Sequence, residues 1–367
     1  MKLRCEREAL ADALSTAGRA SGKPTSMAAL SGLRLEVAGD LLRVTGTDLD
    51  LTISTEVTVA GGADGVAVAP GRLVTDIVRA LPPGAVTVES DDEELRVTSG
   101  RSQFAVRTHP ADDFPRVLRP TGDPVTLPAE GLAEALRQVV RAASTEESRP
   151  ILTGVLVAAE GDGLRMVATD SYRLAVRELP GLGALDEGQR VLVPSRALSE
   201  LQRLLSGPGA GSEVTLRLGA HDATFTVGTV QLTTRLIEGE FPDYRKLIPS
   251  AYPNRLIVGR EALLDAVRRV KLLAREATTP VRIALRADAI ELTVITADYG
   301  QATEDVDAKY EGAEMTVAFN PAYLIDGVEA LAGDEVQLDT LDALKPATIR
   351  PTDGGDYLYL LMPIRVS

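Results

Sequence analysis

The sequence predicts an α+β protein built from three tandem copies of one domain, each with two helices packed on antiparallel sheets. Three features that recur in each third of the chain support this prediction: an amphipathic helix, a strand pair that turns at an aspartate, and a second helix followed by two strands. The 367 residues can hold roughly two or three domains. Their hydrophobic share of 44% is sufficient to form hydrophobic cores, although Trp is absent.

The first helix of each copy has the same apolar pattern. Residues 8–14 read EALADAL, residues 131–136 read GLAEAL, and residues 261–267 read EALLDAV. Apolar side chains three and four positions apart lie on one face of a helix. The pattern therefore predicts an amphipathic helix near the start of each domain.

The strand pair that follows also recurs. Residues 41–50 read LLRVTGTDLD, residues 164–172 read LRMVATDSY, and residues 290–299 read IELTVITADY. The aspartates of the three turns are Asp48, Asp170 and Asp298. An aspartate at such a turn can bond its own backbone, so ordinary hairpin chemistry explains the three. The alternative is that one of them serves an enzyme as acid, base or metal ligand.

A second helix recurs at residues 70–81, 194–205 and 320–331, where Pro, Ser or Asn opens the helix by fixing φ or by capping. Strand-like pairs follow each copy at residues 85–89 with 95–98, 213–218 with 223–227, and 335–340 with 347–350. The six expected helical spans are 4–23, 72–81, 130–149, 195–206, 260–275 and 321–332. Short polar stretches between the copies predict domains at 1–120, 124–249 and 253–367.

Composition excludes several classes of function. With one cysteine, Cys5, an intrachain disulfide is impossible, and a cytoplasmic location is expected. The charged start gives no signal peptide, and no apolar stretch is long enough to span a membrane. No zinc-protease, C-x-x-C, P-loop or nucleophile-elbow motif occurs, so no cofactor or metal is implied.

Charge is distributed unevenly along the chain. The net charge of -14, taken alone, argues against nucleic-acid binding. The expected helices nevertheless carry a slight excess of Lys and Arg, whereas the strands and loops carry an excess of Asp and Glu. The helix propensity of Arg accounts for part of this asymmetry.

Over all three repeats, from Met1 to Arg365, the chain resembles the β subunit of bacterial DNA polymerase III, the sliding clamp. The segments that carry the resemblance are residues 168–176, ATDSYRLAV, 241–244, FPDY, 319–324, FNPAYL, and 361–365, LMPIR. Their order and spacing are more specific than any one of them. The high Ala, Arg and Gly content with few Lys suggests a GC-rich bacterium such as an actinomycete.

The resemblance implies a non-catalytic processivity factor, a head-to-tail homodimer that closes as a ring of clamp domains around duplex DNA. The helices would line the hole, and a weakly basic lining would suit a ring that holds DNA by topology. The implied DNA-facing residues are Lys23, Arg137, Arg141, Arg149, Arg196, Arg203, Arg268 and Lys271. The alternative for each is an ordinary solvated surface cation.

The resemblance also implies two protein-binding surfaces. Phe104 and Val106, on an edge strand, would meet Leu272 and Leu273 of the partner copy, unless all four are core residues. A pocket between the second and third domains would take short linear motifs of the replicative polymerase α subunit, the clamp loader, other polymerases and repair proteins. The implied pocket residues are Leu152, Thr169, Ser171, Tyr172, Arg173, Leu174, Pro242, Lys246, Leu247, Pro346, Leu360, Leu361, Met362, Pro363, Ile364 and Arg365.

The residue types fit such a pocket. Met362 adapts to differing guests, Arg173 and Arg365 can bond peptide carbonyls or carboxylates, and Pro363 ends the last strand and leaves the tail free. A plain core strand is the alternative for Leu358 and Leu361.

Three departures from the family pattern leave other functions open. Residues 24–30 lack a second proline, Lys246 stands where many relatives have Arg, and the loop at 181–188 is short. One alternative is a specialised second clamp, for example one that avoids a pocket-blocking antibiotic. Another is a repeat scaffold that binds proteins without DNA.

Overall fold

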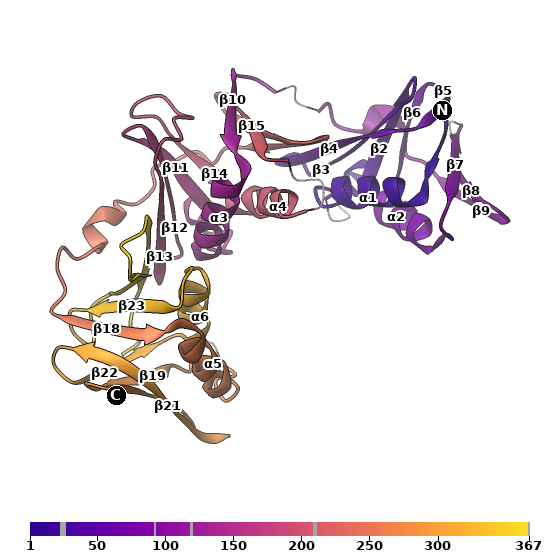
Figure 1. The fold of residues 1–367 in the computed structure, drawn as a ribbon. Coiled ribbons are helices and arrows are strands. Elements are labelled where there is room, and N and C mark those ends of the chain that lie inside the picture. The colour runs from indigo at the N-terminus through magenta and orange to yellow at the C-terminus, as the bar shows by residue number, and fades with distance from the viewer. Residues whose placement is uncertain (23–26, 92, 118–119, 208–210, 277, 366–367) are drawn as a thin grey trace. The chain divides into compact units, whose positions relative to one another are not determined.

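A computed structural model describes residues 1–22, 27–91, 93–117, 120–207, 211–276 and 278–365 (Figure 1). The chain divides into two compact units. The first comprises Met1–Glu130 with Arg196–Leu236, and the second Gly131–Ser195 with Ile237–Ser367. Each unit is built of helices on antiparallel sheets, which confirms the predicted α+β class.

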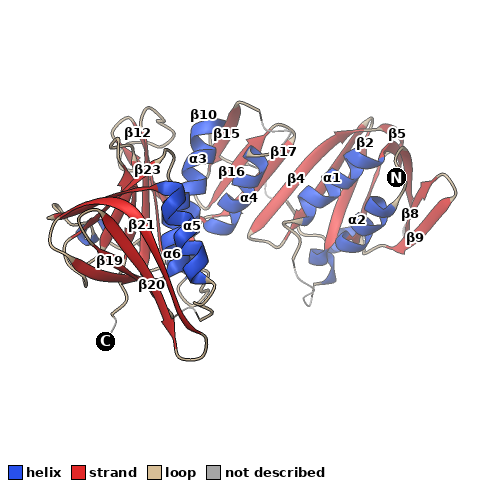
Figure 2. Cartoon of the chain, turned by 60° about the horizontal axis from the view of Figure 1, so that its bottom comes forward, coloured by secondary structure: helices blue, strands red, loops and turns tan. Residues whose placement is uncertain are grey.

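The first unit contains two sheets. Its strands are β1 (Lys2–Glu6), β2 (Gly32–Ala38), β3 (Leu41–Thr47), β4 (Leu51–Thr58), β5 (Ala60–Ala63), β6 (Gly65–Pro70), β7 (Ala85–Ser90), β8 (Glu94–Ser99), β9 (Ser102–Arg107), β10 (Pro124–Pro128), β15 (Glu213–Leu218), β16 (Asp222–Val227) and β17 (Val230–Arg235). The strand order is β5-β1-β7-β8-β9 in one sheet and β10-β15-β16-β17-β4-β3-β2-β6 in the other. Figure 2 shows helices α1 (Arg7–Gly18) and α2 (Gly71–Ala80) side by side on the strands, and α4 (Ser195–Leu205) on the strands β15 to β17.

The second unit is organised around one twelve-stranded sheet. Its strands are β11 (Gly154–Glu160), β12 (Gly163–Thr169), β13 (Arg173–Leu179), β14 (Arg190–Pro194), β18 (Asn254–Gly259), β19 (Val281–Leu285), β20 (Ala289–Thr296), β21 (Gly300–Glu311), β22 (Met315–Phe319), β23 (Glu335–Thr340), β24 (Ala347–Pro351) and β25 (Tyr357–Leu361). Their order is β14-β11-β12-β13-β25-β24-β23-β18-β21-β20-β19-β22. Helices α5 (Arg260–Lys271) and α6 (Pro321–Glu329) pack against each other, and α3 (Ala129–Val139) begins at the boundary between the units.

The six expected helices all form, but five of the six expected spans are too long, and the span 72–81 is shifted by one residue from Gly71–Ala80. The helix expected at residues 130–149 ends at Val139 and continues as a 3-10 turn, Val140–Ala142. Pro150 disfavours helical geometry at Arg149. Pattern alone placed the helix, and Pro150 explains only why the last expected residue, Arg149, is not helical.

The aspartate turns use hairpin chemistry in two of the three copies. Asp48 Oδ1 accepts from the amide of Leu51 at 2.8 Å, and Asp170 Oδ1 accepts from the amide of Arg173 at 3.0 Å. In the third copy, Thr296 Oγ1 accepts from the amide of Tyr299 instead, at 3.2 Å. The expected equivalence of Asp298 with the other two aspartates is therefore wrong in detail.

The β1 strand places Cys5 in the core of the first copy. The alternating pattern of β1 buries Leu3 and Cys5 together among aliphatic side chains. Burial, helped by the neighbouring Glu6 carboxylate, raises the pKa of the Cys5 thiol from 9.0 to about 11. The thiolate, which is the reactive species, is thus disfavoured in the fold.

We expect the native chain to resist a disulfide reagent such as DTNB at pH 8, with labelling of Cys5 at least ~100-fold slower than in the unfolded chain. Because the folded pKa is the higher one, the contribution of the thiol to stability is fully present below pH 9.0 and is lost as the pH rises toward about 11. Stopped-flow labelling with and without denaturant measures the ratio. Equal rates would mean that Cys5 is accessible.

Candidate functional site

The turn between β12 and β13 is tied by its own side chains. Asp170 Oδ1 also accepts from the amide of Tyr172 at 2.9 Å, and the Thr169 hydroxyl donates to the Arg173 carbonyl at 2.6 Å. Ser171 has a φ of 80°, a left-handed conformation that is uncommon for a residue with a side chain. The turn thereby holds Tyr172 outward and Arg173 inward.

Strand β25 pairs with β13 and continues the site from the last part of the chain. Leu174 lies opposite Leu360, and the amide of Met362 donates to the Tyr172 carbonyl at 2.9 Å just past the end of β25. The amide of Ile364 donates to the Ala318 carbonyl at 2.7 Å. The expectation that Pro363 leaves the tail free is therefore wrong, because backbone bonds fix the tail on both sides of this proline.

A segment at residues 241–248 covers the apolar face of this strand pair. Tyr244, in the 3-10 turn Tyr244–Leu247, is buried against Leu174 and Leu360. The ring of Phe241 meets the Tyr244 ring edge-on, with 6.4 Å between centroids. Of the implied pocket residues, Leu174 and Leu360 are thus packed in a core beneath Tyr244.

The sixteen implied pocket residues all lie in the second unit but differ in exposure. Buried are Leu152, Thr169, Leu174, Leu360 and Leu361. Half-buried are Arg173, Pro346, Pro363 and Ile364. Exposed are Ser171, Tyr172, Pro242, Lys246, Leu247, Met362 and Arg365. For Leu361 the core-strand interpretation is right, whereas Leu358 is half-buried beside Tyr244.

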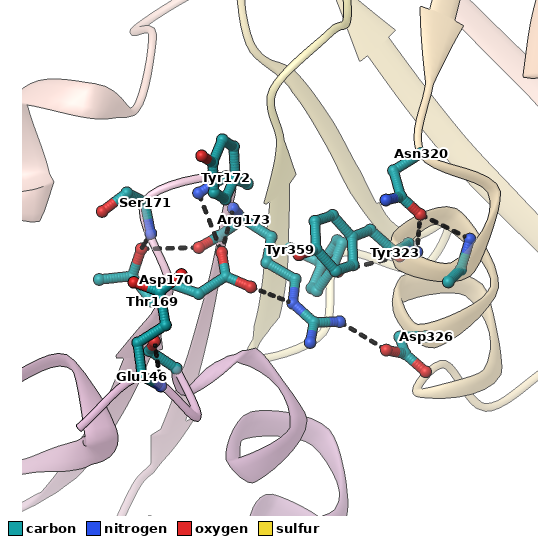
Figure 3. Close-up of polar contacts among 12 residues, drawn as sticks. Glu146, Thr169, Asp170, Ser171, Tyr172, Arg173, Asn320, Tyr323, Asp326 and Tyr359 are labelled. Atoms are coloured by element: carbon teal, nitrogen blue, oxygen red, sulfur yellow. Dashed lines mark hydrogen bonds and ion pairs between the residues drawn. The ribbon is translucent and has the colours of Figure 1, made fainter. Parts of the chain in front are cut away.

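Arg173 is held by two carboxylates. Its Nε donates to Asp170 Oδ2 at 2.9 Å, and its Nη1 donates to Asp326 Oδ2 on α6. Figure 3 shows the side chain reaching from the turn toward α6. Burial lowers the pKa of Arg173, but Tyr359, Asp326 and Asp170 together hold it above its ordinary value. Arg173, which was expected to bond peptide carbonyls or carboxylates, lies within an ion-pair network of the chain itself.

Two aromatic rings complete the site. The Arg173 guanidinium lies 4.2 Å from the ring centroid of Tyr323, and the Tyr323 ring stacks on Tyr172 with centroids 6.5 Å apart. Tyr172 remains 58% exposed. Asn320 caps α6 by accepting from the amides of Ala322 and Tyr323, which sets the position of the Tyr323 ring.

Sequence reasoning missed Asn320, Tyr323 and Asp326 as parts of this site. The FNPAYL segment marked the resemblance and predicted a helix start, but nothing in its pattern indicates which side chain it meets. The Asp326–Arg173 pair joins residues 153 positions apart. The pairing of β25 with β13 helps to bring α6 to the turn.

The implied DNA-facing cations differ in how their side chains are held by hydrogen bonds and ion pairs. The two terminal nitrogens of Arg137 donate to the Glu329 and Ala330 carbonyls at 2.9 and 3.0 Å, which makes it a tie to α6 rather than an available cation. Arg141 and Arg268 both pair with Glu329, at 2.9 and 2.8 Å. The hydrogen bond from Arg268, with that from Arg141, holds the pKa of Glu329 below its ordinary value.

The remaining cations are placed as follows. Arg149 bonds Glu146 and Ser171, Arg196 pairs with Asp48, and Arg203 lies 3.6 Å from Glu200. Lys271 is half-buried at the end of α5, and Lys23 lies outside the described residues.

The implied dimer residues also differ among themselves. Phe104 is 40% exposed on β9, an end strand of its sheet, and Leu272 is 77% exposed just after α5. Leu273 is half-buried. Val106 belongs to the core of the first copy, so for this residue the core alternative is right.

Within the described part of the chain, no group of three or more His, Cys, Asp or Glu is arranged to hold a metal ion. No helix in the same residues has the length and apolar character needed to cross a membrane.

Comparisons with known proteins cover the whole length. Family models match the N-terminal, central and C-terminal domains of the DNA polymerase III beta subunit at residues 1–118, 126–243 and 245–365. The beta sliding clamps of Streptomyces coelicolor and Escherichia coli K12 are 33% and 32% identical, each over 100% of both chains.

Solved structures agree with these matches. The clamp of Bartonella birtlesii bound to griselimycin has a TM-score of 0.94 at 31% identity, and the Bacillus subtilis clamp has 0.92 at 28%, each covering 100% of both chains. The matches confirm the resemblance and the non-catalytic role that it implied, and they favour neither the second-copy nor the DNA-independent alternative. The chain belongs to the family of DNA polymerase III beta subunits, the bacterial sliding clamps.

Proposed function

We propose that the chain closes with a second copy, head to tail, into a ring around duplex DNA in the cytoplasm. The ring tethers the replicative polymerase, the clamp loader and other replication and repair proteins, which it holds by short linear motifs. Each chain contributes three clamp domains, at 1–120, 124–249 and 253–367. The observation that carries the proposal is a pair of open strand edges with opposite charge.

The first open edge is β9. It ends its sheet, and the exposed Arg101 and Arg107 lie at and beside its ends, with Phe104 between them. An unpaired edge of this kind is a ready template for another strand. Its basic and apolar side chains call for an acidic partner edge with an apolar neighbour.

The second open edge has that character. Among the described residues, 300–307 of β21 pair with β20 only, while residues 308–311 pair with β18. Asp305 and Asp307 are exposed there, and Leu272 lies at the end of α5, which packs on β21. Antiparallel addition of β9 to this edge would bury Phe104 near Leu272 and set arginines against carboxylates.

The DNA-facing set that we propose is Lys23, Arg141, Arg149, Arg196, Arg203, Arg268 and Lys271. Arg137 is left out because α6 carbonyls hold its guanidinium. Exposed ion pairs such as Arg268 with Glu329 are weak, so phosphates can compete for these side chains. A weak grip suits a ring that must move along DNA.

The motif-binding site that we propose keeps the sixteen implied residues except the core residue Leu361 and adds Tyr323. Tyr172, Leu247 and Met362 are 58%, 48% and 38% exposed, respectively, and offer apolar contacts beside the buried Leu174 and Leu360. Met362 can adapt its shape to different guests.

Retention on DNA tests the ring. Loaded by a clamp loader onto nicked circular DNA, the chain should stay bound through gel filtration at ~0.15 M salt, where weak electrostatic contacts are screened. Cutting the circle once should release nearly all of it. Equal retention on circular and linear DNA would refute topological binding.

A further inference from the structure

We propose that Asp326 is a specificity-determining positioning residue: by neutralising and orienting Arg173, it makes the site choose neutral rather than acidic side chains next to Tyr172 and Tyr323. This inference rests on the proposed motif-binding function. It assigns to Asp326 a role that acts through Arg173 and involves no direct contact with the ligand.

The charges around Arg173 are the first observation that supports this role of Asp326. Its side chain is 10% exposed and faces two carboxylates, Asp170 from its own turn and Asp326 from α6. Arg141 lies 3.8 Å from the second oxygen of Asp326, so this carboxylate is shared between two guanidinium groups. Because carboxylates neutralise its charge from two sides, Arg173 presents no unbalanced positive charge to a ligand.

The placement of Asp326 on α6 is the second observation that supports this role. Asp326 follows Tyr323 by three positions on α6, so both side chains lie on the face that meets the turn (Figure 3). The Tyr359 hydroxyl donates to the Tyr323 carbonyl at 2.9 Å, which ties α6 to β25. The guanidinium is thereby held over the Tyr323 ring, with its carbon 4.2 Å from the ring centroid.

The consequence concerns selectivity. An arginine without Asp326 would keep one carboxylate partner but could turn a terminal nitrogen toward the ligand, where it would attract aspartate or glutamate. With Asp326 in place, the aromatic faces of Tyr172 and Tyr323 remain the main feature that a ligand side chain meets.

The test uses two sets of polymerase-tail peptides, with either a single aspartate or a single asparagine at each position in turn. For the wild-type chain, the asparagine peptides should bind at least as tightly as their aspartate twins. In Asp326→Asn, the affinity for the aspartate peptide at one position should rise roughly tenfold relative to the affinity for its asparagine twin. This difference should shrink with added salt. Fluorescence anisotropy measures both affinities.

Glu329→Gln is the matched control. It removes the same charge from the same helix, and its partners are Arg141 and Arg268 rather than Arg173. It should leave every aspartate-to-asparagine ratio unchanged, whereas a purely structural role of Asp326 would weaken all peptides alike. Unchanged ratios in Asp326→Asn would overturn the inference. Failure of the wild-type chain to bind any peptide would refute the proposed function, and this inference with it.

Discussion

Leu272→Asp should convert the homodimer into a monomer at micromolar concentration. Leu272 is 77% exposed in the single chain, and in the proposed ring it is covered by the partner's open edge. An aspartate there would be desolvated beside the carboxylates of β21 without a guaranteed partner, which costs on the order of 3–5 kcal/mol at each interface. Light scattering should then give a mass near 38.9 kDa rather than twice that value.

Leu247→Asp is the control for this experiment. Leu247 is also an exposed leucine, at 48%, but it lies in the segment that covers the β13–β25 pair. The substitution should leave the dimer intact and weaken motif peptides, whereas Leu272→Asp should weaken the dimer and leave peptide affinity unchanged. A dimer that survives Leu272→Asp with normal mass would show that the interface lies elsewhere.

Local features of the fold could be predicted from the sequence because they depend on neighbouring residues. The Asp48 and Asp170 turns bond amides two and three positions away, so a short segment contains all the atoms involved. The amphipathic helices follow from apolar spacing alone. The resemblance put Phe104 and Val106 together at the dimer interface, but it could not say that the core ends between them.

The part that could not be predicted depends on pairing between distant segments. The resemblance implied that Arg173 meets a ligand, and its own turn contains only one carboxylate, Asp170. Its second partner, Asp326, reaches it through the pairing of β13 with β25 and the tie between Tyr359 and α6. The burial of Leu174 and Leu360 has the same origin, because Tyr244 comes from a segment whose own sequence shows no preference for this face.

Removal of residues 362–367 should abolish motif-peptide binding while leaving the fold and the dimer intact. Strand β25 ends at Leu361, so the truncation keeps every ladder bond to β13 and β24. It removes the amide of Met362 that fixes the Tyr172 carbonyl and the amide of Ile364 that is bonded to Ala318. The exposed Met362 side chain is lost as well.

The expected loss in peptide affinity is roughly 100-fold, since a few anchoring side chains carry most of the energy of such small interfaces. Fluorescence anisotropy with a polymerase-tail peptide measures it, and light scattering should still report a dimer. The Leu272→Asp chain provides the opposite pattern for comparison, with a monomer that keeps its peptide affinity. Unchanged peptide binding after truncation would place the motif site away from Tyr172. A loss of the dimer would mean that the tail also stabilises the dimer interface.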